Sequence, residues 1–221
     1  MLSVPFRDRC EAGRGLAEAV LDLGVLGEDD EPVVVGLARG GVEVAAEVAN
    51  VLRAPLDALA VRKIRHPWQP EYGLGAVAPG GVTYLRARDG LSEEQVAAAV
   101  ADAATAVEAL DARVHESHGA VPVDGTTCVL VDDGLATGGT MVAGARWARV
   151  QGARRIVVAV PVGAAATVHR FEQDVDVDAV VCPVTPIDFG AVGLWYDDFH
   201  QVSEDDVRAL LAAGTRGAVG I

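Results

Sequence analysis

The chain has 221 residues, of which 51% are hydrophobic and 23% are charged. This balance excludes an intrinsically disordered chain, and the length suits one folded domain with a buried core. The formal net charge of −14 argues against a nucleic-acid partner, because a protein that follows a phosphate backbone needs a basic face.

Neither a membrane segment nor a disulfide framework is visible in the sequence. The longest apolar run, residues 156–168, is interrupted by proline, glycine and threonine and is too short to span a bilayer. Cys10, Cys128 and Cys182 lie far apart without paired spacing. We therefore expect no membrane partner, reduced thiols and a cytoplasmic location.

Short β-branched segments alternate with amphipathic segments, which predicts an α/β fold with a mostly parallel central sheet flanked by helices. In chain order we predict a helix over 7–22, a strand over 32–37, a helix over 42–52, a strand over 56–64, a helix over 92–115, a strand over 127–132, a helix over 139–151, a strand over 155–162, a helix over 164–171, a strand over 179–184 and a helix over 204–213. Ser92 and Gln95 form a capping box at the start of the longest helix.

Two segments interrupt this alternation. Residues 64–91 contain three prolines and many glycines, so we expect a flexible loop that leads into a hairpin or short extra strands. Residues 185–202 concentrate aromatic side chains and predict a small hood before the C-terminal helix. We expect a single domain over 1–221, with its core at about 30–184.

The most informative stretch is VLVDDGLATGGTM, residues 129–141. A strand that runs into a glycine-rich turn and then a helix gathers several backbone N–H groups around one point, which attracts phosphate. Thr137 and Thr140 add hydroxyl donors. Asp132 and Asp133 can accept hydrogen bonds from sugar hydroxyls or hold a hard divalent cation. Together these groups predict a site for a 5-phosphorylated ribose.

This motif resembles the ribose-phosphate loop of the type I phosphoribosyltransferases, which bind 5-phosphoribosyl 1-pyrophosphate (PRPP) with Mg²⁺. The resemblance implies that Asp132 and Asp133 contact the ribose hydroxyls and hold Mg²⁺, directly or through water. It also implies that the 5-phosphate is held by the turn of Gly134, Leu135, Ala136, Thr137, Gly138, Gly139 and Thr140.

The wider likeness covers residues 32–202 and is closest to a group of predicted phosphoribosyltransferases of unassigned substrate. That group shares the ARGG turn, the RKI strand end and the WY-x-x-F tail of this chain. The resemblance implies a type I phosphoribosyltransferase-like fold with a small C-terminal hood. It also implies a homodimer and two small-molecule substrates, PRPP and a nitrogenous acceptor.

The first core strand is followed by a turn where the family receives pyrophosphate, here Ala38, Arg39, Gly40 and Gly41. The Arg39 side chain and the free N–H groups of the turn suit a pyrophosphate oxygen. Lys63 resembles the basic residue that the family places beside the pyrophosphate.

Three further residues are candidates through the same resemblance. Glu71 lies in the segment that closes over the reacting centre in the family, and it is a candidate general base. In the hood, Phe189 resembles the aromatic residue that stacks on a base, and Asp197 resembles an aspartate at the base edge. An equally available interpretation is that the hood aromatics simply cover the edge of the sheet.

The predicted activity is transfer of the 5-phosphoribosyl group to a nitrogenous acceptor, such as a nucleobase, with release of pyrophosphate. Several purine enzymes of the family have an aspartate where this turn has Ala136, which argues against hypoxanthine or guanine, while LATGGTM is similar to adenine phosphoribosyltransferases. Two alternatives stay open: a non-catalytic module that senses PRPP or a nucleotide, and a hydrolase acting on a ribose phosphate.

Overall fold

The computed structural model describes residues 6–27, 30–116 and 119–217, so the other residues of the expected 1–221 domain lie outside the described part. Its helices are α1 (Arg9–Asp22), α2 (Gly40–Leu52), α3 (Glu93–His115), α4 (Gly139–Val150), α5 (Ala165–Glu172) and α6 (Glu204–Gly217). Its strands are β1 (Pro32–Ala38), β2 (Leu56–Ala60), β3 (Arg62–His66), β4 (Gln69–Ala78), β5 (Val82–Leu85), β6 (Thr127–Val131), β7 (Arg155–Ala159) and β8 (Ala179–Val181), and two short 3₁₀ turns are η1 (Pro79–Gly81) and η2 (Val192–Trp195).

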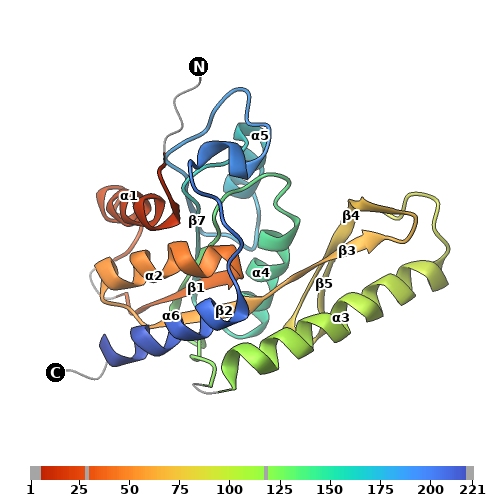
Figure 1. Ribbon diagram of the computed structural model, residues 1–221, viewed down its shortest axis with the longest axis horizontal. Helices are drawn as coiled ribbons and strands as arrows, with labels where there is room; N and C mark the ends of the chain where they lie inside the picture. The colour runs from red at the N-terminus through yellow and green to blue at the C-terminus, as the bar shows by residue number, and fades with distance from the viewer. Residues whose placement is uncertain (1–5, 28–29, 117–118, 218–221) are drawn as a thin grey trace.

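Five parallel strands in the order β2-β1-β6-β7-β8 form the central sheet. Helices cover both faces of this sheet: α1, α2 and α6 pack on one face, and α4 and α5 pack on the other (Figure 1). The predicted α/β fold with a parallel sheet flanked by helices is therefore confirmed. The predicted capping box at Ser92 and Gln95 is also present at the start of α3.

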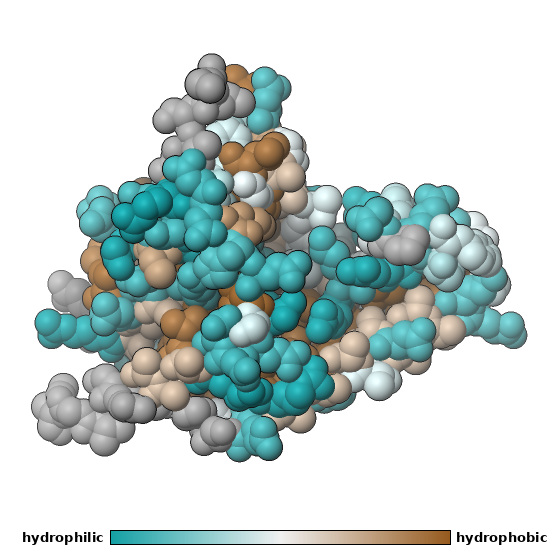
Figure 2. Space-filling model, in the orientation of Figure 1, coloured by the Kyte–Doolittle hydropathy of each residue, from teal (hydrophilic) through white to brown (hydrophobic). Residues whose placement is uncertain are grey.

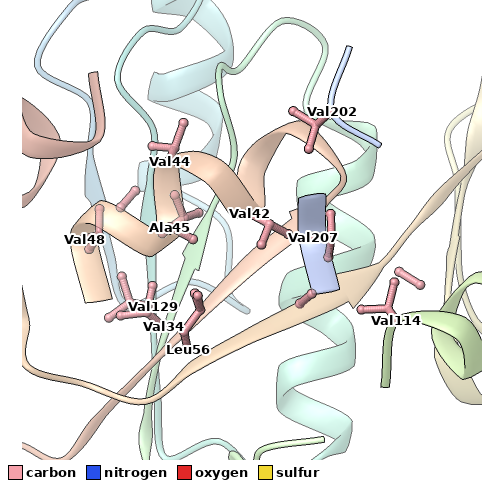
Figure 3. Packing of buried hydrophobic residues seen from close by; sticks show 14 of the residues in the cluster. Val34, Val42, Val44, Ala45, Val48, Leu56, Val114, Val129, Val202 and Val207 are labelled. Atoms are coloured by element: carbon pink, nitrogen blue, oxygen red, sulfur yellow. The ribbon is translucent and has the colours of Figure 1, made fainter. Parts of the chain in front are cut away.

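Alternate residues of each central strand supply the two hydrophobic cores, because successive side chains of a strand point to opposite faces. On β6, Cys128 and Leu130 pack on the side of α4, while Val129 and Val131 pack on the side of α2. Figure 3 shows Val129 in one packed cluster with Val48 of α2. Burial on both faces explains why the strands are almost continuously apolar in the sequence.

The segment after β2 departs from the prediction. The strand expected over 56–64 is two strands in two sheets, because β3 leaves the central sheet and pairs with β4 in an antiparallel β3-β4-β5 ribbon. The expected hairpin or short extra strands within 64–91 are present as β4 and β5, but most of this segment is strand, so the flexible loop expected there is much shorter. Ile64, Leu74 and Val77 are buried against α3, so the ribbon has a packed face of its own. In Figure 1, the ribbon and α3 project from the central sheet as an arm.

Hydrophilic residues cover much of the face shown in Figure 2, with hydrophobic residues among them near its centre. None of the described helices is both long and apolar enough to cross a lipid bilayer. Cys10, Cys128 and Cys182 are free thiols, as the sequence predicted.

Candidate functional site

The candidate residues lie where two neighbouring strands of the central sheet end. β1 and β6 are adjacent and parallel, with Gly36 opposite Val131. After β1 the chain continues to β2 on one side of this pair, and after β6 it continues to β7 on the other side. In open α/β sheets, such a switch point forms a crevice at the carboxyl ends of the strands that binds ligands.

The turns that follow β1 and β6 touch each other. A Cβ atom at Gly40 would collide with Asp133 Oδ2, and a Cβ atom at Gly41 would lie 2.9 Å from Asp132 Oδ1. Only glycine allows this close approach of the two backbones. The peptide bond between residues 38 and 39 is cis. Within the described part of the chain, the N–H groups of Gly40 and Gly41 donate to no protein acceptor.

Helix α5 fixes the orientation of the peptide groups in the glycine-rich turn. Thr167 Oγ1 donates a hydrogen bond to the carbonyl oxygen of Ala136 at 2.7 Å, and Arg170 Nη2 donates one to the carbonyl oxygen of Thr137 at 2.7 Å. Since the C=O and N–H groups of one trans peptide unit point in opposite directions, the N–H groups that follow these carbonyls point away from α5.

The N–H groups of residues 136–140 donate to no acceptor among the described residues. These N–H groups lie at the N-terminus of α4. There, unpaired donors and the helix dipole together favour an anion. Leu135 differs, because its N–H donates to the Val162 carbonyl at 2.9 Å and the residue is only 1% exposed. The engaged amide of Leu135 corrects the prediction that this residue binds phosphate.

Gly138 allows the turn to enter the helix. Its φ angle is +75°, in the left-handed region that favours glycine. A Cβ atom at this position would also lie 2.5 Å from the ring of Phe171. Both constraints explain why this position in the turn is a glycine.

A cavity of about 250 Å³ adjoins the turn. The turn lines it with Thr137, Gly139 and Thr140, and the β3-β4-β5 ribbon and the residue after it line it with Lys63, Glu71, Tyr72, Gly73, Gly75, Tyr84 and Arg86. The fold thus brings the predicted Lys63 and Glu71 into the same cavity as the glycine-rich turn. Arg86 adds a cation to this cavity. Its position opposite the turn depends on the pairing of β4 with β5, and no sequence motif predicts that pairing.

The two aspartates occupy an electrostatically unusual position. Burial raises the pKa of the Asp132 carboxyl well above its usual range, and the neighbouring Asp133 charge adds to this effect. Burial also raises the pKa of Asp133, although the Arg9 guanidinium opposes the shift. Arg9 Nε donates a hydrogen bond to Asp133 Oδ2 at 3.0 Å. Sequence reasoning missed Arg9, which lies in α1, far from the motif in the chain.

The hood packs differently from the prediction. Phe189 is 8% exposed, and its ring stacks on Trp195 with 6.4 Å between ring centroids. Trp195 and Tyr196 are buried with Ala12 of α1. The Phe189 ring is thus packed inside the hood, which corrects the expectation that it stacks on a base. Asp197 is exposed.

The fold and the site define the class: a doubly wound α/β protein with unpaired N–H groups at a helix N-terminus and two carboxylates at the switch point of its sheet. The chain belongs to the phosphoribosyl transferase domain family, whose model matches residues 10–197. The predicted family and its type I phosphoribosyltransferase-like fold are therefore confirmed.

Curated relatives agree with this membership, and a solved structure shares the fold. Two curated proteins from two strains of Mycobacterium tuberculosis, both provisionally named phosphoribosyl transferases, are 42% identical to the chain over 211 residues. Each match covers 93% of this chain and 46% of the relative, so the chain spans about half the length of these relatives. The crystal structure of TT1426 from Thermus thermophilus is 40% identical, with a TM-score of 0.79 over 94% of this chain and 98% of that chain.

Proposed function

We propose that the chain transfers the 5-phosphoribosyl group of PRPP to a nitrogenous acceptor, such as a nucleobase, and releases pyrophosphate. One observation carries this proposal: the unpaired N–H groups of residues 136–140 lie directly after two carboxylates at the switch point of the sheet. The N–H groups and the hydroxyls of Thr137 and Thr140 bind the 5-phosphate. Asp132 and Asp133 accept hydrogen bonds from the ribose hydroxyls.

The pyrophosphate lies on the side of the turn that follows β1. Gly40 and Gly41 offer unpaired N–H groups there, at the N-terminus of α2. Arg39 is exposed beside them, and Lys63 lines the neighbouring cavity. These donors and cations stabilise the negative charge that develops on pyrophosphate as the bond to the anomeric carbon breaks, while the site holds the reacting groups in line.

Mg²⁺ fits this donor set together with the substrate. Asp132 and Asp133 are half-buried residues, and Mg²⁺ prefers oxygen ligands such as their carboxylates. The described residues contain no cluster of three acidic, histidine or cysteine side chains that could enclose a metal. Mg²⁺ commonly keeps several waters and is bound by one or two carboxylates plus substrate phosphates. When bound, it would neutralise charge on the departing pyrophosphate.

Two residues are proposed to act on the acceptor. Glu71 lines the cavity next to the turn, where its carboxylate can take a proton from the acceptor nitrogen. Glu71 is a candidate for this role because Ala136 offers no carboxylate within the turn, unless the acceptor needs no general base. Asp197 is exposed on the hood and is proposed to contact the acceptor. The homodimer stays a prediction.

Pyrophosphate release tests the proposal. The protein is incubated with PRPP and Mg²⁺ in the presence of each common nucleobase or of ammonia. We expect release that depends on one acceptor, and we expect Asp132→Asn to reduce it about tenfold to a hundredfold, as the loss of a charge-assisted hydrogen bond implies.

The alternatives give different outcomes. A sensing module would bind PRPP without releasing pyrophosphate with any acceptor. A hydrolase would release phosphate or pyrophosphate at the same rate without an acceptor. Either result would contradict the proposed transfer.

A further inference from the structure

Arg9 is a buried cation in a place where a cation is unfavourable on its own. It is the first residue of α1 and is 4% exposed. A positive charge at this end of a helix opposes the helix dipole, and burial removes its hydration. A buried guanidinium is therefore stable here only because it is paired.

The chain places Arg9 through the segment before α1. The Asp8 carboxylate caps α1 by accepting a hydrogen bond from the Glu11 N–H at 2.8 Å. Phe6 forms a parallel β-bridge with Tyr196 of the hood, and the Asp197 N–H donates to the Phe6 carbonyl at 3.0 Å. These contacts fix where α1 begins relative to the hood.

The Arg9 guanidinium joins three parts of the molecule. Its Nε donates to Asp133 Oδ2 at 3.0 Å, and its Nη1 donates to the His200 carbonyl at 2.8 Å. The guanidinium also lies 4.0 Å from the centre of the Phe199 ring. Arg9 thus connects α1, the hood and the turn that follows β6.

A second carboxylate faces Arg9 from α2. Glu43 Oε2 is buried without a hydrogen-bond partner among the described residues, 3.7 Å from Arg9 Nη1 and 3.6 Å from His200 Nε2. The guanidinium therefore lies between the carboxylates of Glu43 and Asp133. This arrangement leaves Arg9 little freedom to move.

Asp133 is held from outside its own loop at two points. Arg9 occupies Oδ2 of its side chain, and the Tyr196 hydroxyl donates to its carbonyl oxygen at 2.6 Å. No hydrogen bond within the described residues occupies the second carboxylate oxygen, Oδ1. The carboxylate therefore has one oxygen fixed by the protein and one available to a ligand.

We propose that Arg9 is a positioning residue of the ribose site. It holds one oxygen of Asp133 so that the other is presented to a hydroxyl of a ribosyl ligand, and it does not itself touch the ligand. This inference rests on the proposed function, because it takes the ligand of Asp133 to be a ribosyl phosphate.

Calorimetry with two ligands tests this role. PRPP and inorganic pyrophosphate are each titrated, with Mg²⁺, into the wild type, Arg9→Met, Arg9→Lys and Arg14→Met. Arg14 is the matched control, because it lies on the same helix and pairs with Glu47 of α2 at 3.0 Å, but its side chain is 58% exposed.

We expect Arg9→Met to weaken PRPP binding about tenfold to a hundredfold, which is the range for losing a hydrogen bond to a charged group. Pyrophosphate binding should change much less, because pyrophosphate has no ribose hydroxyl. Arg9→Lys should restore part of the PRPP affinity, and Arg14→Met should bind both ligands like the wild type. A general disturbance of the fold would not produce this selectivity.

Other outcomes overturn the inference. Wild-type PRPP affinity in Arg9→Met, or an equal loss for both ligands, would show that Arg9 does not position Asp133 for ribose. If circular dichroism shows that Arg9→Met does not fold, Arg9→Lys becomes the test variant. A partial loss of PRPP affinity without a matching loss of pyrophosphate affinity would then support the inference. Wild-type affinity for PRPP in Arg9→Lys would refute it. A wild-type protein that binds pyrophosphate but not PRPP would overturn the proposed function and this inference with it.

Discussion

At the scale of single residues, the geometry of the glycine-rich turn (residues 134–140) and of the neighbouring turn after β1 depends on glycines, which have no side chain. Gly138 adopts a left-handed φ angle against the Phe171 ring. Gly40 and Gly41 let the turn after β1 touch the two aspartates. Each glycine is explained by a backbone position that a larger residue could not occupy without moving its neighbours.

Substitution of Gly138 tests this account of the turn. We expect Gly138→Ala to lower the free energy of unfolding by about 1–3 kcal/mol, because alanine would be strained at this φ angle and its methyl group would meet Phe171. Gly139→Ala is the control for stability, since the nearest atom to a Cβ there is Tyr84 Cε1 at 4.0 Å. Urea unfolding of both variants measures the difference, and equal stabilities would contradict the account.

The sequence was informative about residues whose role is local and uninformative about those whose role depends on distant contacts. Asp132 and Thr137 are predicted site residues because of their place between a strand and a helix, and the structure places both at the switch point of the sheet. Leu135 was misassigned because its N–H is engaged by Val162, a pairing between two loops that the motif does not show. Arg9 was missed because its partner Asp133 is 124 positions away in the chain.

At the scale of elements, α5 and the β3-β4-β5 ribbon complete the site from two sides. Thr167 and Arg170 of α5 hold the carbonyl oxygens of the turn. The ribbon brings Lys63 and Glu71 to the opposite side of the turn. Helix α5 therefore fixes the turn, and the ribbon faces it across the cavity. Neither element belongs to the sequence motif of residues 129–141.

Helix α3 is joined to the central sheet by a pH-sensitive contact. His115 Nε2 lies 2.9 Å from Asp57 Oδ1 on β2, and its Nδ1 lies 3.3 Å from Asp111 Oδ1. Hydrogen bonds to Asp111 and Asp57 raise the pKa of His115 to about 10. Because the pKa is higher in the folded state than in the unfolded state, protonation of His115 stabilises the fold.

This stabilisation should be complete below pH 6.5, the ordinary pKa of histidine, and should be lost as the pH rises toward about 10. Urea unfolding between pH 6 and pH 10 measures it. We expect the free energy of unfolding to fall more steeply with pH in the wild type than in His115→Gln. Parallel curves for the two proteins would show that His115 does not contribute in this way.

The elements of the central sheet could be predicted because burial on both faces produces continuous apolar strands between amphipathic helices. The ribbon could not, for two reasons. The change from β2 to β3 occurs at Val61, inside what looks like a single strand. Pro67 and the segment Pro79–Gly81 lie in turns of an antiparallel sheet, but Pro70, Gly73 and Gly75 lie inside β4, where their residue types argue against a strand. That sheet depends on pairing between separate segments.

At the scale of the whole molecule, the proposed binding site for a polyanion lies in an acidic protein. The net charge is −14, yet the switch point gathers unpaired N–H groups from two helix N-termini and the side chains of Arg39 and Lys63. Local donors and cations of this kind can favour an anion despite an unfavourable total charge. The hood and α1 add the contacts that hold Asp133.

The most direct test of the central claim is the response of backbone amides to a ligand that carries the terminal phosphate. At 22.8 kDa, the protein is accessible to amide-resolved ¹⁵N NMR during titration with ribose 5-phosphate. The amide signals of residues 136–140 should shift strongly, while that of Leu135, which is bonded to Val162, should shift less. Unchanged signals over residues 136–140 at saturating ligand would contradict the claim that this turn binds the phosphate.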